Sequence, residues 1–325
     1  MALKSTLAGV LAGLTLLAAA CGSDDDDAST ATEAVTTDAP VATTAGSDTA
    51  GSDTAGTTAG SEPAGEVPQR IVSLSATHTE TLFAIGAGDQ VIAVDDQSNY
   101  PAEAAAVMTD LSGYTPNVEA IAGYDPDLVV TSGDDELTAQ LEAVGIPVWV
   151  GASAATFDEA YDQIEQLGAA TGHVGEAAEL VGQMQADLEA MAADLPTSET
   201  PLTVFHELSA DGYSASTDTF IGQVYALFGL QNIADAADDG TGYPQLNAET
   251  VIAADPDLVF LADTKCCGES LETVAARPGW AEMSAVVNGN VFAMDDDIAS
   301  RWGPRVVEYA QQVHDAVTQA LVPAG

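Results

Sequence analysis

Basic residues are almost absent from this chain. Its 325 residues contain six Lys and Arg against 51 Asp and Glu, which gives a formal net charge of −45 at pH 7. Nucleic acid and anionic lipid headgroups attract proteins through clustered positive charge, so this balance excludes a DNA- or RNA-binding role. The acidic excess indicates a strongly solvated surface, and by itself it identifies neither fold nor ligand.

Histidine and recognisable catalytic motifs are also scarce. The four histidines, His78, His173, His206 and His314, show no spacing typical of a metal site, so no metal site is predicted. The chain has no Gly-x-Ser-x-Gly motif and no P-loop, and its segment 84–88 lacks the third glycine of a dinucleotide fingerprint. We therefore expect neither an enzyme nor an intrinsic cofactor.

The N-terminus carries the pattern of an export signal. Lys4 precedes an apolar run, Leu7 to Leu17, that is too short to span a bilayer. The run ends in Ala18-Ala19-Ala20-Cys21, which resembles the bacterial lipobox. Residues 1–20 are therefore predicted to be a lipoprotein signal peptide, and acylated Cys21 would hold the protein on the outer face of the cytoplasmic membrane. Plain secretion with a free Cys21 stays open, because Ala18 stands where the lipobox usually has Leu.

Residues 21–68 read as a disordered acidic tether. They contain the run Asp24 to Asp27 and then Ser, Thr, Gly, Ala and Asp in an approximate five-residue repeat. Such a segment buries too little apolar surface to fold, and it has no apolar face on which a structured repeat could stack.

From Arg70 onward, short β-branched runs alternate with helical stretches, which predicts parallel strands joined by crossover helices. A longer helix is predicted over 173–196, because apolar residues recur there at spacings of three and four and Pro196 ends the pattern. It is either an ordinary amphipathic surface helix or a connection between two similar regions. The predicted strands are Ile71–Leu74, Val91–Asp95, Leu128–Thr131, Pro147–Val150, Leu202–Leu208, Leu258–Ala262 and Val291–Met294.

The two regions flanking this helix resemble each other. The segment 118–129, with its Asp-Pro-Asp-Leu-Val motif, is repeated 130 residues later in 248–259. We therefore predict an N-terminal α/β lobe over 69–172 and a C-terminal α/β lobe over 197–325, joined by the helix 173–196.

Several motifs in order resemble the iron-siderophore and cobalamin binding proteins of ABC importers. They are Arg70-Ile71-Val72-Ser73-Leu74-Ser75, the segment 79–86, the two Asp-Pro-Asp-Leu-Val turns, Tyr243-Pro244-Gln245-Leu246 and Arg301-Trp302-Gly303-Pro304-Arg305. The resemblance implies an α/β fold of two lobes, each with a central, mainly parallel sheet, joined by a single long backbone helix, as in class III solute-binding proteins. It also implies a ligand in the interlobe cleft, an ABC permease and its ATPase as partners, and a monomer.

Ligands of open α/β sheets lie beyond the carboxyl ends of the strands. The aromatic candidates could stack on a corrin or catechol ring or pack in the core. The arginines could form either an anion-binding fork or a salt bridge to 295–297. The candidate ligand-binding residues are Ser75, Thr77, His78, Tyr100, Trp149, His206, Tyr213, Lys265, Arg301 and Trp302.

Two further pairs of residues are singled out. Cys266 and Cys267 are adjacent in an exported domain, where oxidation is expected, so a vicinal disulfide is possible; free thiols, metal ligation and an intermolecular bridge stay open. Glu119 and Glu249 each begin a predicted helix, where the helix dipole favours a carboxylate. The resemblance implies that these matching glutamates dock onto arginines of the permease.

The predicted function is capture of a ferric-siderophore-type ligand and its delivery to the permease. Cobalamin or haem is the alternative ligand within the same family. Two functions of a different kind stay open: a receptor for bare divalent metal ions, which would need the histidines to converge, and an enzyme.

Overall fold

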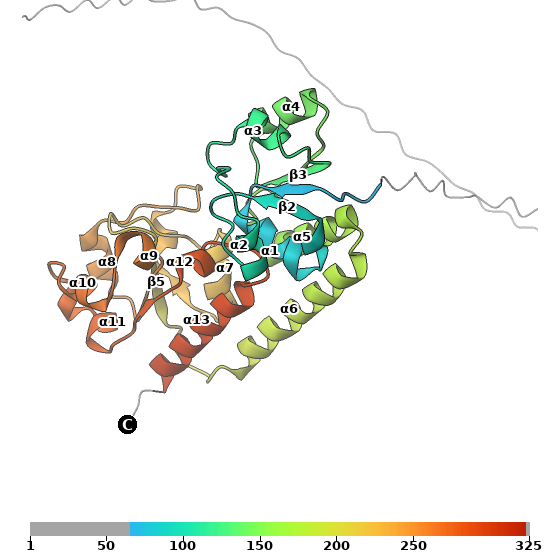
Figure 1. Ribbon diagram of the computed structural model, residues 1–325. Coiled ribbons are helices and arrows are strands. Elements are labelled where there is room, and N and C mark those ends of the chain that lie inside the picture. The colour runs from blue at the N-terminus through green and yellow to red at the C-terminus, as the bar shows by residue number, and fades with distance from the viewer. Residues whose placement is uncertain (1–65, 323–325) are drawn as a thin grey trace, which may run out of the picture. The chain divides into compact units, whose positions relative to one another are not determined.

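Two four-stranded parallel sheets form the centre of the fold (Figure 1). The computed structural model describes residues 66–322, which belong to a single unit. The predicted signal peptide, Cys21 and nearly all of the predicted tether lie outside the described residues. Among the described residues, no helix is both long enough and apolar enough to cross a membrane.

Both sheets have the same strand order. The N-terminal sheet runs β2-β1-β3-β4 and the C-terminal sheet β6-β5-β7-β8, with every neighbouring pair parallel. This confirms the predicted fold class, and seven of the strands lie within the predicted segments. The two-residue strand β6 was not predicted, because Gln231-Asn232 forms no apolar run. The strands are β1 (Ile71–Ser73), β2 (Val91–Val94), β3 (Leu128–Thr131), β4 (Val148–Val150), β5 (Thr203–Glu207), β6 (Gln231–Asn232), β7 (Leu258–Leu261) and β8 (Val291–Ala293).

Helices connect the strands and cover the sheets. In the N-terminal lobe they are α1 (Ala76–Ala84), α2 (Ala102–Ala106), α3 (Val118–Ala122), α4 (Asp135–Ala143) and α5 (Phe157–Thr171). In the C-terminal lobe they are α7 (Phe220–Leu227), α8 (Ala248–Ala254), α9 (Thr264–Cys267), α10 (Leu271–Ala275), α11 (Ser284–Val287), α12 (Asp296–Ala299) and α13 (Val306–Leu321). Short 3-10 turns add η1 (Ala87–Gln90), η2 (Ile233–Ala237) and η3 (Trp280–Glu282).

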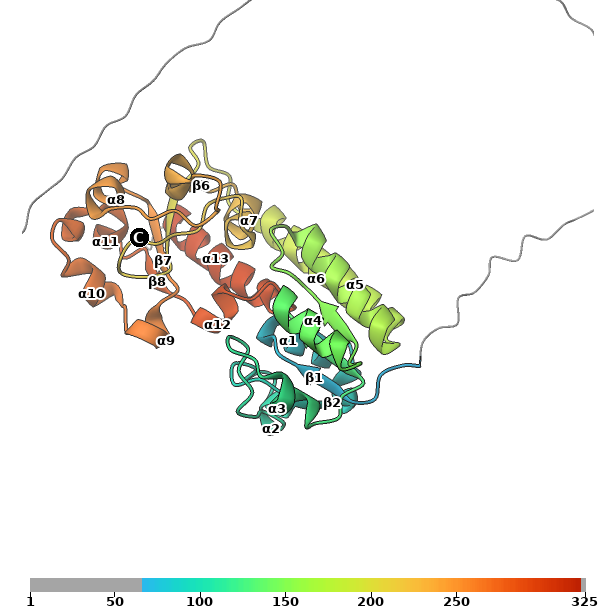
Figure 2. The ribbon, with the colours of Figure 1, turned by 90° about the horizontal axis from the view of Figure 1, so that it is seen from above.

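The long helix α6 (Val174–Asp194) lies between the two lobes in the chain, over nearly the span predicted for it. It packs closely on α5, because Gly168 faces Ala177 and any Cβ at Gly168 would collide with that side chain. The last helix, α13, lies beside α6 in both ribbon views (Figures 1 and 2). One continuous apolar core runs from Ile71 and Leu82 through Met184 of α6 to Tyr225 and Tyr309.

The internal repeat extends to the backbone conformation. Asn117 and Asn247 cap α3 and α8 through their side chains, which accept the amides of Ala120 and Thr250. Downstream, Asp125 and Asp255 have positive φ angles of 51° and 46°, and no other non-glycine residue of 66–322 does. Each pair is 130 residues apart, so the two lobes repeat one design in structure as well as in sequence.

Candidate ligand-binding site

A cavity of about 320 Å³ lies at the carboxyl ends of the N-terminal strands and is closed on one side by the C-terminal lobe. Of the ten predicted ligand-binding residues, Ser75, Thr77, Arg301 and Trp302 line it. It therefore brings together residues that are more than two hundred positions apart. The lining is Leu74, Ser75, Ala76, Thr77, Asp95, Gln97, Gly113, Tyr114, Ser132, Asp297, Ser300, Arg301 and Trp302.

His78 lies directly behind this cavity and does not face it. Its side chain is buried, with Nδ1 2.7 Å from Ser75 Oγ and Nε2 2.9 Å from Gln163 Oε1. Burial lowers the pKa of His78 to about 4, against the opposing effect of the Gln163 hydrogen bond, so the ring is neutral. Because Gln163 Oε1 also accepts the indole N–H of Trp302 at 3.0 Å, the neutral ring is assigned as the Nε2–H tautomer. His78 thus positions Ser75 directly and Trp302 through Gln163. Because His78 is buried, the structure does not support direct contact between its side chain and a ligand.

Arg301 has no free donor fork to offer a ligand. Its guanidinium donates to Glu80 Oε1 at 2.6 Å and to Asp297 Oδ1 at 3.0 Å. The same two terminal nitrogens also donate to Asn99 Oδ1 and to the carbonyl of Gln97, both at 3.1 Å. Two roles were predicted for the arginines, an anion-binding fork and a salt bridge to 295–297. The structure contains the salt bridge to Asp297, and Arg301 also pairs with Glu80 of the other lobe.

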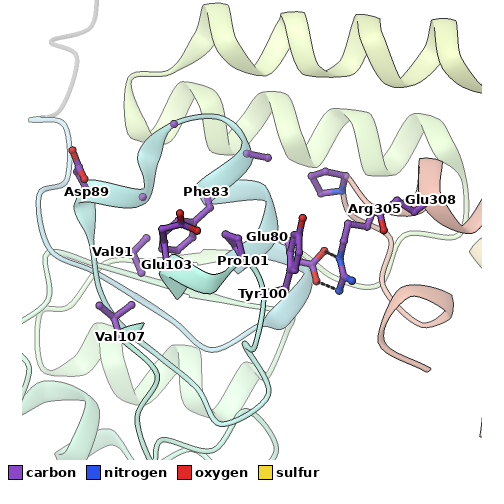
Figure 3. Close-up of a pocket in the computed structure, with 14 residues that line it drawn as sticks. Glu80, Phe83, Asp89, Val91, Tyr100, Pro101, Glu103, Val107, Arg305 and Glu308 are labelled. Atoms are coloured by element: carbon purple, nitrogen blue, oxygen red, sulfur yellow. Dashed lines mark hydrogen bonds and ion pairs between the residues drawn. The ribbon is translucent and has the colours of Figure 1, made fainter. Parts of the chain in front are cut away.

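Glu80 is the centre of this interlobe contact. Its buried carboxylate also accepts Arg305 Nε at 2.9 Å and Nη2 at 2.6 Å (Figure 3). Sequence reasoning missed Glu80, because one glutamate among 51 acidic residues carries no signal of its own.

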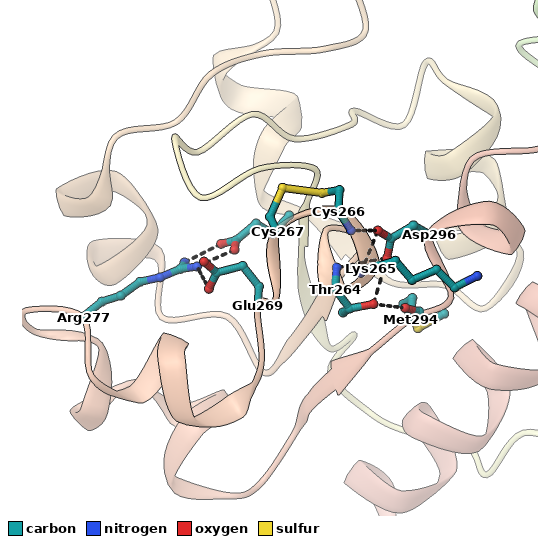
Figure 4. The surroundings of a disulfide bond; sticks show 9 residues. Thr264, Lys265, Cys266, Cys267, Glu269, Arg277, Met294 and Asp296 are labelled. Atoms are coloured by element: carbon teal, nitrogen blue, oxygen red, sulfur yellow. Dashed lines mark hydrogen bonds and ion pairs between the residues drawn. A yellow bond between two sulfur atoms is a disulfide. The ribbon is translucent and has the colours of Figure 1, made fainter. Parts of the chain in front are cut away.

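Lys265 is likewise engaged at the edge of the C-terminal lobe. Its ammonium pairs with Asp295 and, at 2.9 Å, with Asp297. The carboxylate of Asp296 accepts the backbone amides of Thr264, Lys265 and Cys266, which fixes helix α9 against α12 (Figure 4). Lys265 does not line the cavity.

The structure joins Cys266 and Cys267 in a disulfide between adjacent residues. Figure 4 shows it at the end of α9, between Asp296 on one side and Glu269 on the other. Gly268 follows with a φ of 77°, a conformation that turns the chain at the end of α9 and that glycine adopts without strain.

A partly buried group of charges lies beside the disulfide. Arg277 forms a two-bond ion pair with Glu207, at 2.6 Å for both contacts, and pairs with Glu269 at 2.7 Å. Asp263 is also buried, and neither of its carboxyl oxygens has a hydrogen-bond partner among the described residues. Burial, followed by repulsion from Glu207 and Glu269, raises the pKa of Asp263 to about 7.

Four predicted residues lie elsewhere. His206 is buried against Tyr225, with Nδ1 2.6 Å from the phenol oxygen, and burial lowers its pKa to about 3. The expectation that His206 faces the cleft is therefore wrong in this conformation. Trp149 packs edge-on against His78 and belongs to the core. Tyr100 lines a different cavity, and Tyr213 is exposed on a loop of the C-terminal lobe.

Tyr114 was not among the predicted ligand contacts, although it lines the cavity. Tyr114 is 82% exposed at the cavity mouth and lies beside Gly113 in a loop. An aromatic residue next to glycine in a loop is the sequence signal that could have found Tyr114. Asp95 follows β2, and burial raises its pKa. Asp95 and Asp297 give the cavity an acidic lining.

Glu119 and Glu249 occupy equivalent positions in the two lobes. Each is exposed in the first turn of its helix, two residues after the capping asparagine. The helix-start role expected for both residues is therefore present in the structure.

Known proteins resemble this chain over most of its described length. The periplasmic binding protein family matches residues 71–298. The chain is 32% identical over 259 residues to an uncharacterized ABC transporter substrate-binding lipoprotein of Bacillus subtilis, YvrC, covering 77% of this chain and 80% of that protein. It is 30% identical over 250 residues to a cobalamin-binding protein of Halobacterium salinarum, covering 74% of this chain and 67% of that protein.

Solved structures of proteins from the same family resemble this structure. The periplasmic vitamin B12 binding protein BtuF of Vibrio cholerae superposes with a TM-score of 0.64 at 28% identity, covering 78% of this chain and 98% of that one. The haem-binding protein RhuT from Roseiflexus sp. RS-1 superposes with a TM-score of 0.68 at 26% identity, covering 78% and 99%. The family is one of solute-binding transport proteins and not of enzymes. The chain therefore belongs to the class III periplasmic binding proteins, the substrate-binding proteins of ABC importers.

Proposed function

We propose that this protein captures a neutral or cationic metal chelate, a corrinoid of the cobalamin type, and delivers it to an ABC permease. One observation carries the choice of ligand class: within residues 66–322, no basic side chain is free at the candidate cavity. Arg301 is committed to Glu80 and Asp297, and Lys265 to Asp295 and Asp297.

A ligand with several negative charges would meet an unfavourable cavity. Asp95 and Asp297 line it, and both terminal nitrogens of Arg301, the cation in the described lining, donate to protein acceptors. An anionic catecholate chelate or the propionates of haem would leave negative charge without a partner, which is costly away from water. The amide-bearing side chains of a corrinoid match the Ser, Thr and Gln groups present.

Flat aromatic surface supports a large ring-shaped ligand. Tyr114 and Trp302 line the cavity, and Tyr213 and Tyr243 are each nearly half exposed on loops of the C-terminal lobe. Tyr213 forms a backbone bridge with Gln245, so these two tyrosines are held on neighbouring segments. A cavity of about 320 Å³ encloses only part of a corrinoid, so the remainder would lie across the mouth between the lobes.

The names of the relatives point the same way. Cobalamin-binding proteins of Halobacterium salinarum and Vibrio cholerae are each 30% identical to this chain. The sequence predicts a ferric siderophore ahead of a corrinoid; we propose the opposite order, which the acidic lining and the names of these relatives support. A ferric hydroxamate stays the second candidate, because such chelates are also neutral or cationic and suit the acidic lining.

Delivery and anchoring complete the proposal. Exposed Glu119 and Glu249 would dock onto basic residues of the permease, with an ATPase driving import. Acylation of Cys21 would hold the protein on the outer face of the cytoplasmic membrane. Replacing Cys21 by Ser should release it to the medium, and unchanged membrane retention would contradict the anchor.

The ligand class is tested by titration of tryptophan fluorescence with four chelates. Cyanocobalamin is expected to bind most tightly, followed by a ferric trihydroxamate, with haem and a ferric tris-catecholate at least about tenfold weaker. Tyr114→Ala should weaken cyanocobalamin binding about tenfold, whereas Tyr114→Phe, which keeps the ring, should not. Tightest binding of the tris-catecholate would overturn the charge argument.

Docking is tested separately from capture. The double variant Glu119→Ala/Glu249→Ala should bind cyanocobalamin normally but fail to support its uptake. Each exposed charge pair contributes only about 0.2 to 1 kcal/mol, so the single variants should show mild defects. Loss of ligand binding by the double variant, or full uptake with it, would contradict docking through these residues.

A further inference from the structure

A second and larger cavity, of about 830 Å³, lies on a different part of the protein. Its walls come from α1, η1, β2 and α2 of the N-terminal lobe and from the start of α13 (Figure 3). It shares no lining residue with the candidate ligand cavity. The lining is Glu80, Phe83, Ala84, Gly86, Gly88, Asp89, Val91, Tyr100, Pro101, Glu103, Val107, Pro304, Arg305 and Glu308.

The lining combines apolar side chains with carboxylates. Phe83, Val91, Pro101, Val107 and Pro304 supply a mostly apolar wall that is partly or fully buried. A volume of this size is within the range of small-molecule sites, about 300 to 1,000 Å³. The cavity can therefore hold an organic molecule with an apolar body.

Carboxylates outnumber bases in the lining. The side chains of Asp89, Glu103 and Glu308 take part in no ion pair or hydrogen bond within residues 66–322. Arg305, the one base in the described lining, is held by Glu80 and covers the ring of Tyr100 at 4.2 Å from its centre. Arg301 shares the same Glu80, and the charge of Arg305 also attracts Glu308, so the lining keeps an excess of carboxylates over this one base.

The other bases of the described residues are engaged elsewhere. Within residues 66–322, Lys265, Arg277 and Arg301 are engaged by carboxylates elsewhere. Arg70 donates to the carbonyls of Tyr124 and Asp125. Residues 22–65 contain neither Lys nor Arg, so that segment cannot supply a cation either. Within residues 22–322, therefore, no further base is available to this cavity, and a bound molecule could supply the positive charge.

We propose that this cavity is a second binding site, for a small organic cation that carries an ammonium group on an apolar or aromatic body. The body would lie against Phe83, Pro101 and Val107, and the ammonium would face Glu103 and Glu308. The two cavities share no lining residue, but the Glu80–Arg301 ion pair joins a residue of each, so the variants below leave that pair unchanged.

The arrangement suits an organic cation better than a metal ion. In Figure 3, Asp89 lies at one end of the cavity and Glu308 at the other, with Glu103 between them. Within the described part of the chain, no three His, Cys, Asp or Glu side chains lie close enough together to hold a metal. Separated carboxylates beside an apolar wall offer an ammonium group one or two acceptors next to its apolar body, and they lack the close grouping of ligands that a metal ion needs.

The test compares three probes of nearly the same body by isothermal titration calorimetry and saturation-transfer NMR. The probes are 2-phenylethylammonium, neutral 2-phenylethanol and anionic phenylacetate, each added to the protein without any importer ligand. We expect saturable one-to-one binding of the ammonium compound. Binding of the alcohol should be at least about tenfold weaker, and phenylacetate should not bind. Equal binding of the alcohol and the ammonium compound would overturn the role of charge.

Matched variants locate the site. Glu103→Gln/Glu308→Gln should weaken ammonium binding about tenfold, since each exposed carboxylate facing a cation contributes about two- to fivefold. The control Glu142→Gln/Glu179→Gln removes two exposed carboxylates outside this cavity and should change affinity less than about twofold. Equal weakening by both pairs would mean that the general negative field, and not this cavity, attracts the probe.

A filling variant provides a second check on location. Ala84 is exposed at the end of α1 and lines the cavity, so Ala84→Phe adds a ring to the cavity without disturbing the buried core. This variant should abolish binding of 2-phenylethylammonium while leaving cyanocobalamin binding unchanged. Normal binding of the ammonium probe to Ala84→Phe would place the site elsewhere and overturn the proposal.

Discussion

Glu80 of the N-terminal lobe and Arg301 of the C-terminal lobe form a buried ion pair, with 2.6 Å between Oε1 and Nη1. The same carboxylate holds Arg305, so a single anion matches two cations and joins the lobes at the start of α13. Burying three charges is costly, and their mutual attraction offsets that cost only while all three are present. The contact therefore fixes the geometry between the lobes more than it adds stability.

Glu80→Gln should destabilise the protein by about 3 to 5 kcal/mol, because two buried guanidinium groups lose their common partner. Urea unfolding followed by circular dichroism measures the change. The exposed control Glu142→Gln should stay within about 0.5 kcal/mol of the parent protein. A cost below about 1 kcal/mol for Glu80→Gln would show that solvent replaces the carboxylate and that the contact is not buried in solution.

Asp263 should make stability fall as pH rises from about 4 to 7. Its pKa is raised to about 7 in the folded protein, so in this range the folded state binds the proton that the unfolded state has released. Stability declines with pH wherever the folded state binds more protons, by up to about 1.4 kcal/mol per unit of pKa difference. The contribution is fully present below the unfolded pKa and is lost as pH rises through the folded pKa.

The Asp263→Asn variant isolates this effect, because its side chain does not titrate. The parent should lose stability between pH 5 and pH 8 as Asp263 ionises. The variant should lose less, so the difference in unfolding free energy between variant and parent should shift in favour of the variant at pH 8. Unfolding free energies at the two pH values give the difference directly. If parent and variant show the same pH dependence between 5 and 8, the carboxyl group of Asp263 is already ionised at pH 5.

Much of the fold follows from local sequence patterns. The strand Leu128–Thr131 and its repeat Leu258–Leu261 are β-branched or apolar runs after an Asp-Pro-Asp turn, and a buried parallel strand needs little more. The start of α6 after Gly172 and its end before Pro196 are likewise local signals.

The site was harder to predict because its decisive contacts are not local. Arg301 and Glu80 are 221 positions apart, and no spacing rule connects them. Alternation along a strand explains the error at His206: neighbouring side chains point to opposite faces, so His206 meets Tyr225 while Glu207 meets Arg277. The rule that ligands lie beyond strand ends identifies a region, not the face to which each side chain points.

Removing the bond between Cys266 and Cys267 should change stability by only about 1 kcal/mol, because adjacent residues enclose almost no chain whose entropy the bond could restrict. Thermal unfolding of the double variant Cys266→Ser/Cys267→Ser tests this. The variant has no cysteine within residues 66–322, so this part of the chain cannot form intermolecular disulfides. Protein purified without reductant should show no reactive thiol at these positions until it is reduced. Two titratable thiols in the unreduced protein would contradict the disulfide.

Stability should rise with salt, because a formal net charge of −45 repels itself in the compact state. At an ionic strength of about 1 M the screening length is near 3 Å, so most of the repulsion between surface carboxylates disappears. The midpoint of thermal unfolding should therefore increase steadily from low salt to about 1 M NaCl. Sucrose matched in osmolality is the control, because it acts by exclusion from the surface and leaves charge unscreened. If NaCl and sucrose raise the midpoint equally, the gain comes from exclusion of the solute from the protein surface. Charge self-repulsion would then not limit the stability of this protein.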